Sequence, residues 1–77
     1  MPEKHPSLSS GDIEKILRRH GFKLSRQKGS HQQFVGFIKG GKHRVTLIAG
    51  RRDFPQGTVK SIIEQSGLSE EEFYGGR

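Results

Sequence analysis

The spacing of apolar residues changes twice along this chain, and the change limits the folds that the chain can adopt. Residues 13–17 place three apolar side chains three and four apart, which is typical of one face of a helix. Residues 22–26 instead alternate apolar and polar side chains, as a half-buried strand does. Residues 59–63 return to the helical spacing. The sequence therefore predicts a helix on each side of a β region.

Residues that favour turns and helix ends divide the chain between these patterns. Ser9 and Asp12 form a capping-box-like pair, and Gly21 favours a left-handed exit from the first helix. Gly29-Ser30 and Gly40-Gly41 are two-residue hairpin signals. The predicted elements are a helix over about residues 10–20 and strands over about residues 22–26, 31–39 and 43–49.

A second helix is expected after a basic loop that ends near residue 54. Asp53 before this helix and Pro55 in its first turn are start signals, and Gly67 ends it. Residues 69–72 form a full capping box, so a short final helical turn follows.

With 77 residues and no cysteine, the chain predicts one small α+β domain without disulfides. We expect an arm over residues 1–8, the domain over 9–74 and a frayed tail over 75–77. Both amphipathic helices bury their apolar faces most economically on one side of a three-stranded antiparallel sheet, which leaves the other side open. The order α-β-β-β-α matches that of the double-stranded-RNA-binding domain, as it does in many small α+β domains.

The second strand can place either of two sets of residues toward the helices. We favour Phe34 and Ile38, because their neighbours on that face carry no charge, whereas the other face carries His31 and Lys39. His31 then points outward just after a turn. An outward Phe37 fits partner binding or edge packing more often than stacking on a nucleic-acid base.

Charge is strongly segregated along the chain. The net charge is +6, and residues 15–52 contain eleven basic and no acidic residues. Such a block favours a polyanion, either a nucleic acid or an acidic protein partner. It lacks the carboxylates of two-metal nucleases, and the four histidines are too far apart for a local metal motif. We expect no metal and no cofactor; a metal assembled across the fold stays an alternative.

Neither a membrane-spanning apolar stretch nor a secretory h-region is present in the sequence. We therefore expect a cytoplasmic protein that has no membrane partner.

One histidine stands out as a candidate for chemistry on RNA. An exposed imidazole exchanges protons with solvent near neutral pH, so an outward histidine such as His31 is a competent base. Such a base can take the proton of a ribose 2′-hydroxyl, which then attacks the adjacent phosphate, while cations stabilise the developing charge. The alternative is an ordinary polar surface histidine, and no acid for the leaving oxygen is evident. The neighbours expected around His31 are Arg26, Lys28, Ser30 and Arg44.

Two motifs carry a resemblance to a known family. Lys28-Gly29-Ser30-His31 is followed three residues later by Phe34, and residues 53–63 contain a Pro-x-Gly-Thr segment followed by apolar positions. Over about residues 10–73 the chain resembles the HicA, or YcfA-like, toxins. The resemblance implies a fold like that of the double-stranded-RNA-binding domain, a ribonuclease that cleaves mRNA, and a HicB-type antitoxin as partner. It makes His31 the catalytic histidine.

The chain departs from this family at one place. Many members have a Pro-His-Pro-like segment after the third strand, where this sequence has Ile48-Ala49-Gly50. Our interpretation is a metal-independent endoribonuclease of a type II toxin–antitoxin pair, monomeric or assembled with its antitoxin. The alternatives are a non-catalytic RNA-binding module and a domain that docks an acidic protein. In the first interpretation Ser30 helps to set the turn, and phosphates are held by Arg26, Lys28, Arg44, Arg51 and Arg52.

Overall fold

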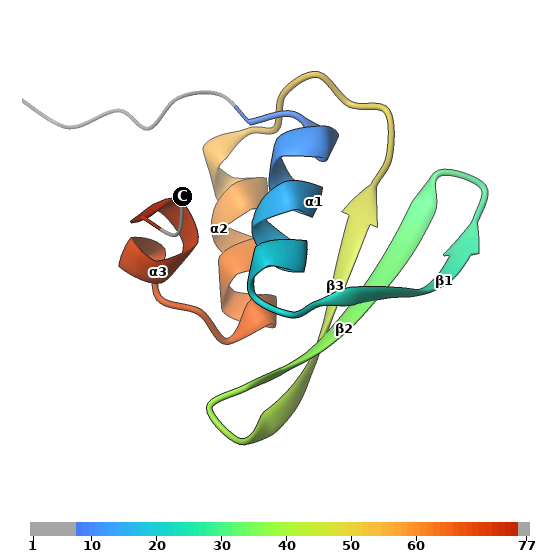
Figure 1. Ribbon diagram of the computed structural model, residues 1–77. Coiled ribbons are helices and arrows are strands. Elements are labelled where there is room, and N and C mark those ends of the chain that lie inside the picture. The colour runs from blue at the N-terminus through green and yellow to red at the C-terminus, as the bar shows by residue number, and fades with distance from the viewer. Residues whose placement is uncertain (1–7, 76–77) are drawn as a thin grey trace, which may run out of the picture.

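The computed structural model describes residues 8–75, so most of the predicted arm and tail (residues 1–7 and 76–77) lies outside the described residues. The predicted order of elements is confirmed, with a short third helix at the end (Figure 1). The elements are α1 (Ser10–Arg19), β1 (Lys23–Lys28), β2 (His31–Ile38), β3 (Gly41–Ile48), α2 (Gln56–Ser66) and α3 (Glu70–Gly75).

The three strands form an antiparallel meander in the order β1-β2-β3. Helices α1 and α2 lie side by side on one face of this sheet, and α3 lies beside α2 (Figure 1). The prediction that both helices cover one face and leave the other open is therefore confirmed. No helix among residues 8–75 is both long and apolar enough to cross a membrane.

The core lies between the helices and the inner face of the sheet. Phe34, Val45 and Leu47 from the sheet are fully buried, as are Ile13 and Leu17 from α1. Burial of each such side chain stabilises the fold by about 1.5–3 kcal/mol, which makes this layer the main source of stability. The remaining core residues are Phe22, Ile38, Phe54, Val59, Ile62, Ile63, Leu68 and Phe73, and Leu8, Ile16 and Tyr74 pack against them.

The first strand differs from its prediction. It spans Lys23–Lys28 rather than residues 22–26, and all of its residues are exposed instead of alternating. Phe22 is buried, but it lies before the strand and packs over Gly36, where an added Cβ would be 2.7 Å from the Phe22 ring. The half-buried strand was a wrong prediction because the helices pack over β3 rather than β1, and the buried Phe22 belongs to the connection before the strand.

The second hairpin turn lies one residue earlier than predicted. Its two turn residues are Lys39 and Gly40, with φ of 53° and 82°, and Gly41 already pairs with Ile38. Two left-handed residues match the right-handed twist of the flanking strands. The Gly40-Gly41 pair misled the prediction because Lys39 occupies the first left-handed position of the turn, although glycine adopts this conformation more readily.

Capping explains where two of the helices begin. Ser9 Oγ accepts from the Asp12 N–H at 3.2 Å, and the Ser9 N–H donates to the Asp12 carboxylate at 3.0 Å, as predicted. These hydrogen bonds lower the pKa of Asp12. Ser69 and Glu72 form the same pair of bonds before α3, at 2.8 and 3.1 Å. The second helix begins close to the start signals at Asp53 and Pro55, but Pro55 is its N-cap residue rather than part of its first turn, and no side chain caps it.

Two contacts tie α3 to the rest of the domain. The Nε2 atom of His20, at the end of α1, lies 3.2 Å from the carbonyl oxygen of Glu72. The Lys39 ammonium in the β2–β3 turn lies 3.1 Å from Oε1 of Glu72. The Ser69 N–H and Lys39 together hold the pKa of the Glu72 carboxyl below its usual range.

Candidate functional site

Alternation along β2 separates two sets of side chains. Phe34 and Ile38 are 0% and 9% exposed on the inner face, whereas Phe37 is 73% exposed on the outer face. His31 has the same parity as Phe37 and is exposed. The prediction that Phe34 and Ile38 face the helices, with His31 pointing outward, is confirmed.

A β-bulge in β1 brings cations to the same face as His31. Leu24 pairs with Phe34 and Arg26 pairs with Gln33, so Ser25 is an extra residue without a partner. The extra residue reverses the alternation of side chains between the two faces of the sheet. Before Ser25, Leu24 lies on the inner face with Phe34; after Ser25, the next even-numbered residue, Arg26, lies on the outer face. Arg26 therefore lies beside Gln33 and Lys28 beside His31, all on the outer face.

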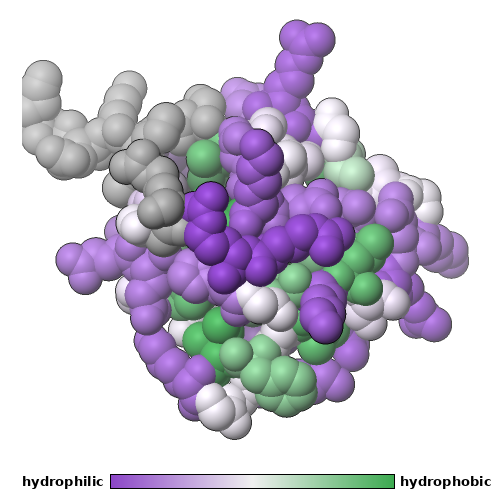
Figure 2. Space-filling model, viewed as in Figure 1, coloured by the Kyte–Doolittle hydropathy of each residue, from purple (hydrophilic) through white to green (hydrophobic). Residues whose placement is uncertain are grey.

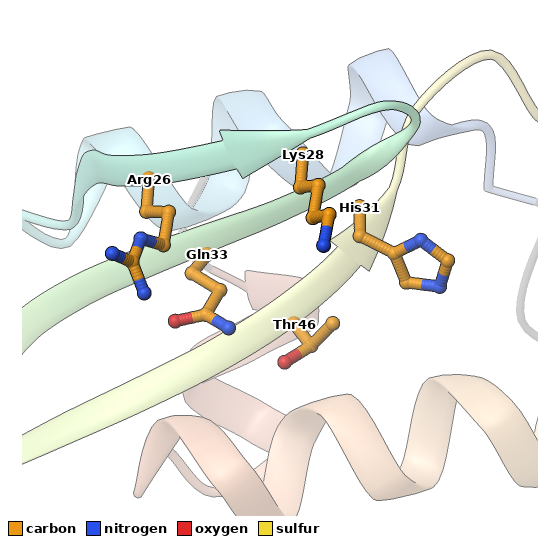
Figure 3. A pocket seen from close by; sticks show the side chains of 5 residues that line it. All are labelled: Arg26, Lys28, His31, Gln33 and Thr46. Carbon is orange, nitrogen blue, oxygen red and sulfur yellow. The ribbon is translucent and has the colours of Figure 1, made fainter.

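These side chains line an open cleft of about 440 Å³ on the outer face of the sheet. Each of the three strands contributes to it, and Lys28 and His31 stand side by side near the β1–β2 turn (Figure 3). His31 is exposed, and among residues 8–75 its ring has no hydrogen-bond partner. The residues that line the cleft are Arg26, Lys28, His31, Gln33 and Thr46.

The outer face carries no carboxylate to neutralise its cations. The strand register places three residues of β1 on this face, namely Lys23, Arg26 and Lys28. It also places there every second residue of β2, starting with His31, and every second residue of β3, starting with Lys42. The two ion pairs within residues 8–75 lie elsewhere, at Arg18–Glu14 and Lys39–Glu72. The face therefore presents an uncompensated positive field, which attracts phosphates.

Backbone contacts hold the turn that precedes His31. Gly29 adopts φ of 59°, a left-handed conformation that glycine tolerates. The Ser30 carbonyl accepts from the Ala49 N–H at 2.7 Å, and the Gln27 side chain donates to the Gly29 carbonyl at 3.0 Å. The structure thus places Ser30 in the turn, where its backbone joins the hairpin to the end of β3.

The other predicted cations lie outside the cleft. Arg44 is on the outer face but pairs with Val35, four residue pairs along β2 from the His31–Ile48 pair. Arg51 follows β3 at the His31 end of the sheet, and its guanidinium lies 5.1 Å from the centre of the Phe54 ring. Arg52 is exposed in the same loop.

Buried Ser10 holds this loop against the start of α1. Its hydroxyl donates to the Ile48 carbonyl at 2.6 Å and accepts from the Arg51 N–H at 2.9 Å. The Ser10 N–H donates to the Arg51 carbonyl at 2.9 Å. The backbone of Arg51 is therefore fixed beside α1, while its side chain donates from Nε to the Asp53 carbonyl at 3.3 Å and lies over Phe54.

Two residues that line the cleft were not among the predicted site residues. Gln33 follows from the parity of β2, since it is two residues after His31. Thr46 pairs with Gln33, so predicting its position required the correct strand register of the second hairpin. The predicted turn was one residue too late, and it therefore gave a different register. Both offer uncharged hydrogen-bonding groups between the cations.

The other two described histidines lie away from the cleft. His20 contacts α3 through Glu72, and the His43 ring lies against Gly67, where an added Cβ would be 2.6 Å away. Among residues 8–75, no three His, Cys, Asp or Glu side chains come together to hold a metal ion. Within this part of the chain, proton transfer at the cleft can involve one imidazole, that of His31.

Comparison with known proteins gives the family. A model described as "HicA toxin of bacterial toxin-antitoxin" matches residues 10–68, which is more than half of the chain and includes all three strands. A search of the curated proteins finds no match. The matched segment also contains every residue that lines the cleft. This chain therefore belongs to the HicA toxin family, whose toxins act in toxin–antitoxin systems with a cognate antitoxin.

Proposed function

We propose that this protein is a metal-independent endoribonuclease that cleaves mRNA, with His31 as general base and acid. One observation carries the proposal: an exposed imidazole stands beside Lys28 on a sheet face without carboxylates. Membership of the HicA family, whose toxins generally cleave mRNA, supports the same substrate.

The proposed reaction uses the 2′-hydroxyl of RNA as the nucleophile. The His31 imidazole takes the proton of this hydroxyl, and the 2′-oxygen forms a bond to the adjacent phosphorus. The bond from phosphorus to the 5′-oxygen of the next nucleotide breaks, which gives a 2′,3′-cyclic phosphate and a 5′-hydroxyl. Lys28 and Arg26 contact the phosphate oxygens and stabilise the charge that builds on them.

The leaving 5′-oxygen takes its proton from water or from the His31 imidazolium formed in the first step. Within the described residues, no second imidazole lines the cleft to serve as a separate acid. We propose that Arg44, Arg51 and Arg52 hold phosphates farther along the strand rather than at the reacting one. A HicB-type antitoxin would inhibit the enzyme by covering this basic face.

The same lack of a second acid favours one alternative, in which the basic face binds RNA without cutting it. The alternative predicts RNA affinity that falls steeply as salt is raised, with no cleavage products. A third possibility, a domain that binds only an acidic protein, predicts neither RNA affinity nor products.

Cleavage assays in EDTA test the proposal. We expect the protein to cut single-stranded RNA, and His31→Ala to lower the rate by a factor of about 100 or more, the usual contribution of a general base. A substrate with a 2′-deoxyribose at the cut should resist, because it lacks the nucleophile.

Two control variants separate the site from the rest of the molecule. His20→Ala removes an imidazole on the helical side and should retain activity, and Lys60→Ala removes an exposed cation of α2 and should do the same. Lys28→Ala should lower the rate. Equal cutting by His31→Ala and the parent, with circular dichroism showing both folded, would overturn the assignment.

A further inference from the structure

The outer face of the sheet extends well beyond the cleft. Phe37 lies on this face six residues after His31, about 20 Å farther along β2 at 3.3 Å per residue. Phe37 is 73% exposed, and Leu24, the other exposed large apolar residue within 8–75, is 38% exposed on the opposite face. Figure 2 shows apolar surface near the β2–β3 turn, at the bottom of the view, bordered by hydrophilic side chains. An aromatic ring this exposed contributes little to the core.

Cations flank this ring on the outer face. Lys42 is the direct cross-strand partner of Phe37, and Arg44 and Lys23 pair with Val35, the next outward residue of β2. All three cations are exposed, and neither ion pair within the described residues involves them. The region therefore combines one bare aromatic ring with several uncompensated positive charges.

Single-stranded RNA matches both parts of this combination, although an exposed phenylalanine alone more often serves protein binding. Each nucleotide carries one phosphate and one flat aromatic base, so a strand offers charge and a stacking face at regular intervals. Phe37 offers one such stacking face, and the cations beside it offer the phosphate contacts. An acidic protein could also bury this ring, as exposed aromatic residues do at protein interfaces, so the test below measures antitoxin binding as well.

We propose that Phe37 is a base-stacking subsite, and that the RNA cut at His31 runs along β2 with its phosphates on Lys23, Lys42 and Arg44. The proposal rests on the function proposed above and adds a position for the strand. The distance from His31 to Phe37 corresponds to about six nucleotides at the 3.4 Å spacing of stacked bases, and to fewer in an extended strand.

The subsite would set the length of RNA that the enzyme needs rather than its sequence. Every base has a face that can stack, so stacking on an aromatic ring tolerates any base. RNA should therefore need to extend several nucleotides past the cut on one side only, since Phe37 lies on one side of His31. Shortening the other side should cost less, because it removes only the phosphate contacts proposed for Arg51 and Arg52 and no stacking.

A tryptophan probe tests the contact directly, because the chain has no tryptophan of its own. Phe37→Trp keeps an aromatic ring, and it is combined with His31→Ala so that the RNA is not cut. Stacking of a base on the tryptophan should quench its fluorescence when a single-stranded RNA oligonucleotide is added. Leu24→Trp is the matched control, since it places the same probe on the opposite face. Its fluorescence should not change.

Affinity measurements complete the test. Phe37→Ala should weaken RNA binding by a factor of about 5–100, and an abasic nucleotide opposite the ring should weaken binding to the parent to a similar degree. Phe37→Tyr should restore binding. Each affinity is measured with His31→Ala added to the variant, so that the RNA stays intact while it is bound.

Two outcomes overturn the proposal in distinguishable ways. If the parent binds and cuts RNA and Phe37→Ala does so equally well, the stacking subsite is wrong while the nuclease stands; loss of antitoxin binding alone in that variant would assign Phe37 to the protein partner. If no variant binds RNA, including the parent, the proposed function fails together with the subsite.

Discussion

The two faces of one strand contrast more sharply than any two separate elements of this domain. Phe34 and Phe37 lie three residues apart in β2, yet one is 0% and the other 73% exposed. The inner face packs against helices α1 and α2 (Figure 1), whereas the outer face carries His31, cations and a bare ring. Side chains that stabilise the fold and side chains that we assign to RNA thus alternate along the same backbone. Stability and activity should therefore respond to different substitutions.

The largest expected difference is in the free energy of unfolding, between variants of Phe34 and of Phe37. Phe34→Ala should lower the free energy of unfolding by about 3–5 kcal/mol, because it removes a fully buried ring and leaves a cavity. Phe37→Ala should change it by less than about 0.5 kcal/mol, since an exposed residue loses few contacts. Urea denaturation followed by circular dichroism measures both. Similar losses for the two variants would contradict the division between the faces.

A smaller effect is expected from adding one methyl group to the inner face. Gly36→Ala would place a Cβ 2.7 Å from the Phe22 ring, so the ring or the strand must shift. Overpacking of this kind costs about 1–3 kcal/mol, measurable by the same urea denaturation.

Gly57→Ala in α2 is the matched control, because nothing lies within 4 Å of the added Cβ and alanine favours a helix. It should not destabilise the domain. If Gly36→Ala were equally harmless, the close packing of Phe22 over β2 would be refuted.

The smallest expected effect concerns the contact between the β2–β3 turn and α3. Because folding lowers the pKa of Glu72 from its usual 4.5, the ionised carboxylate stabilises the fold above that pH. This stabilisation is lost as the pH falls through the lower pKa of the folded state. Glu72→Gln should therefore lower the Tm at pH 7, and the difference from the parent should shrink toward pH 3.

Glu71→Gln is the control for this last prediction, since it removes a neighbouring charge that forms no ion pair within the described residues. Its Tm should differ less from that of the parent at pH 7. A difference between Glu72→Gln and the parent that persists unchanged at pH 3 would show that ionisation of Glu72 contributes nothing.

Much of the fold could be predicted from local chemistry. Ser9 with Asp12 and Ser69 with Glu72 mark helix starts through hydrogen bonds between residues three apart, so neighbouring residues suffice to predict them. The parity of β2 was predicted because one choice would have directed charged side chains toward the core. His31 could be placed outward for the same reason.

The remaining features depend on contacts between distant residues. Leu24-Ser25-Arg26 contains no glycine to mark a bulge, and the extra residue becomes evident only from the pairing with β2. Thr46 enters the cleft through the register of β2 with β3. The Arg51 guanidinium lies over Phe54, a contact within the loop that charge patterning does not reveal.

The unpaired Ser25 has a consequence for how this protein family can vary. A relative that lacked this residue would direct the positions of Arg26 and Lys28 toward the helices, where burial of a charge is costly. Such a relative could keep a cation beside its histidine only by exchanging basic and apolar residues along the second half of the strand. A deletion at this point should therefore be accompanied, in any active homologue, by a compensating inversion of the hydrophobic pattern up to the hairpin turn.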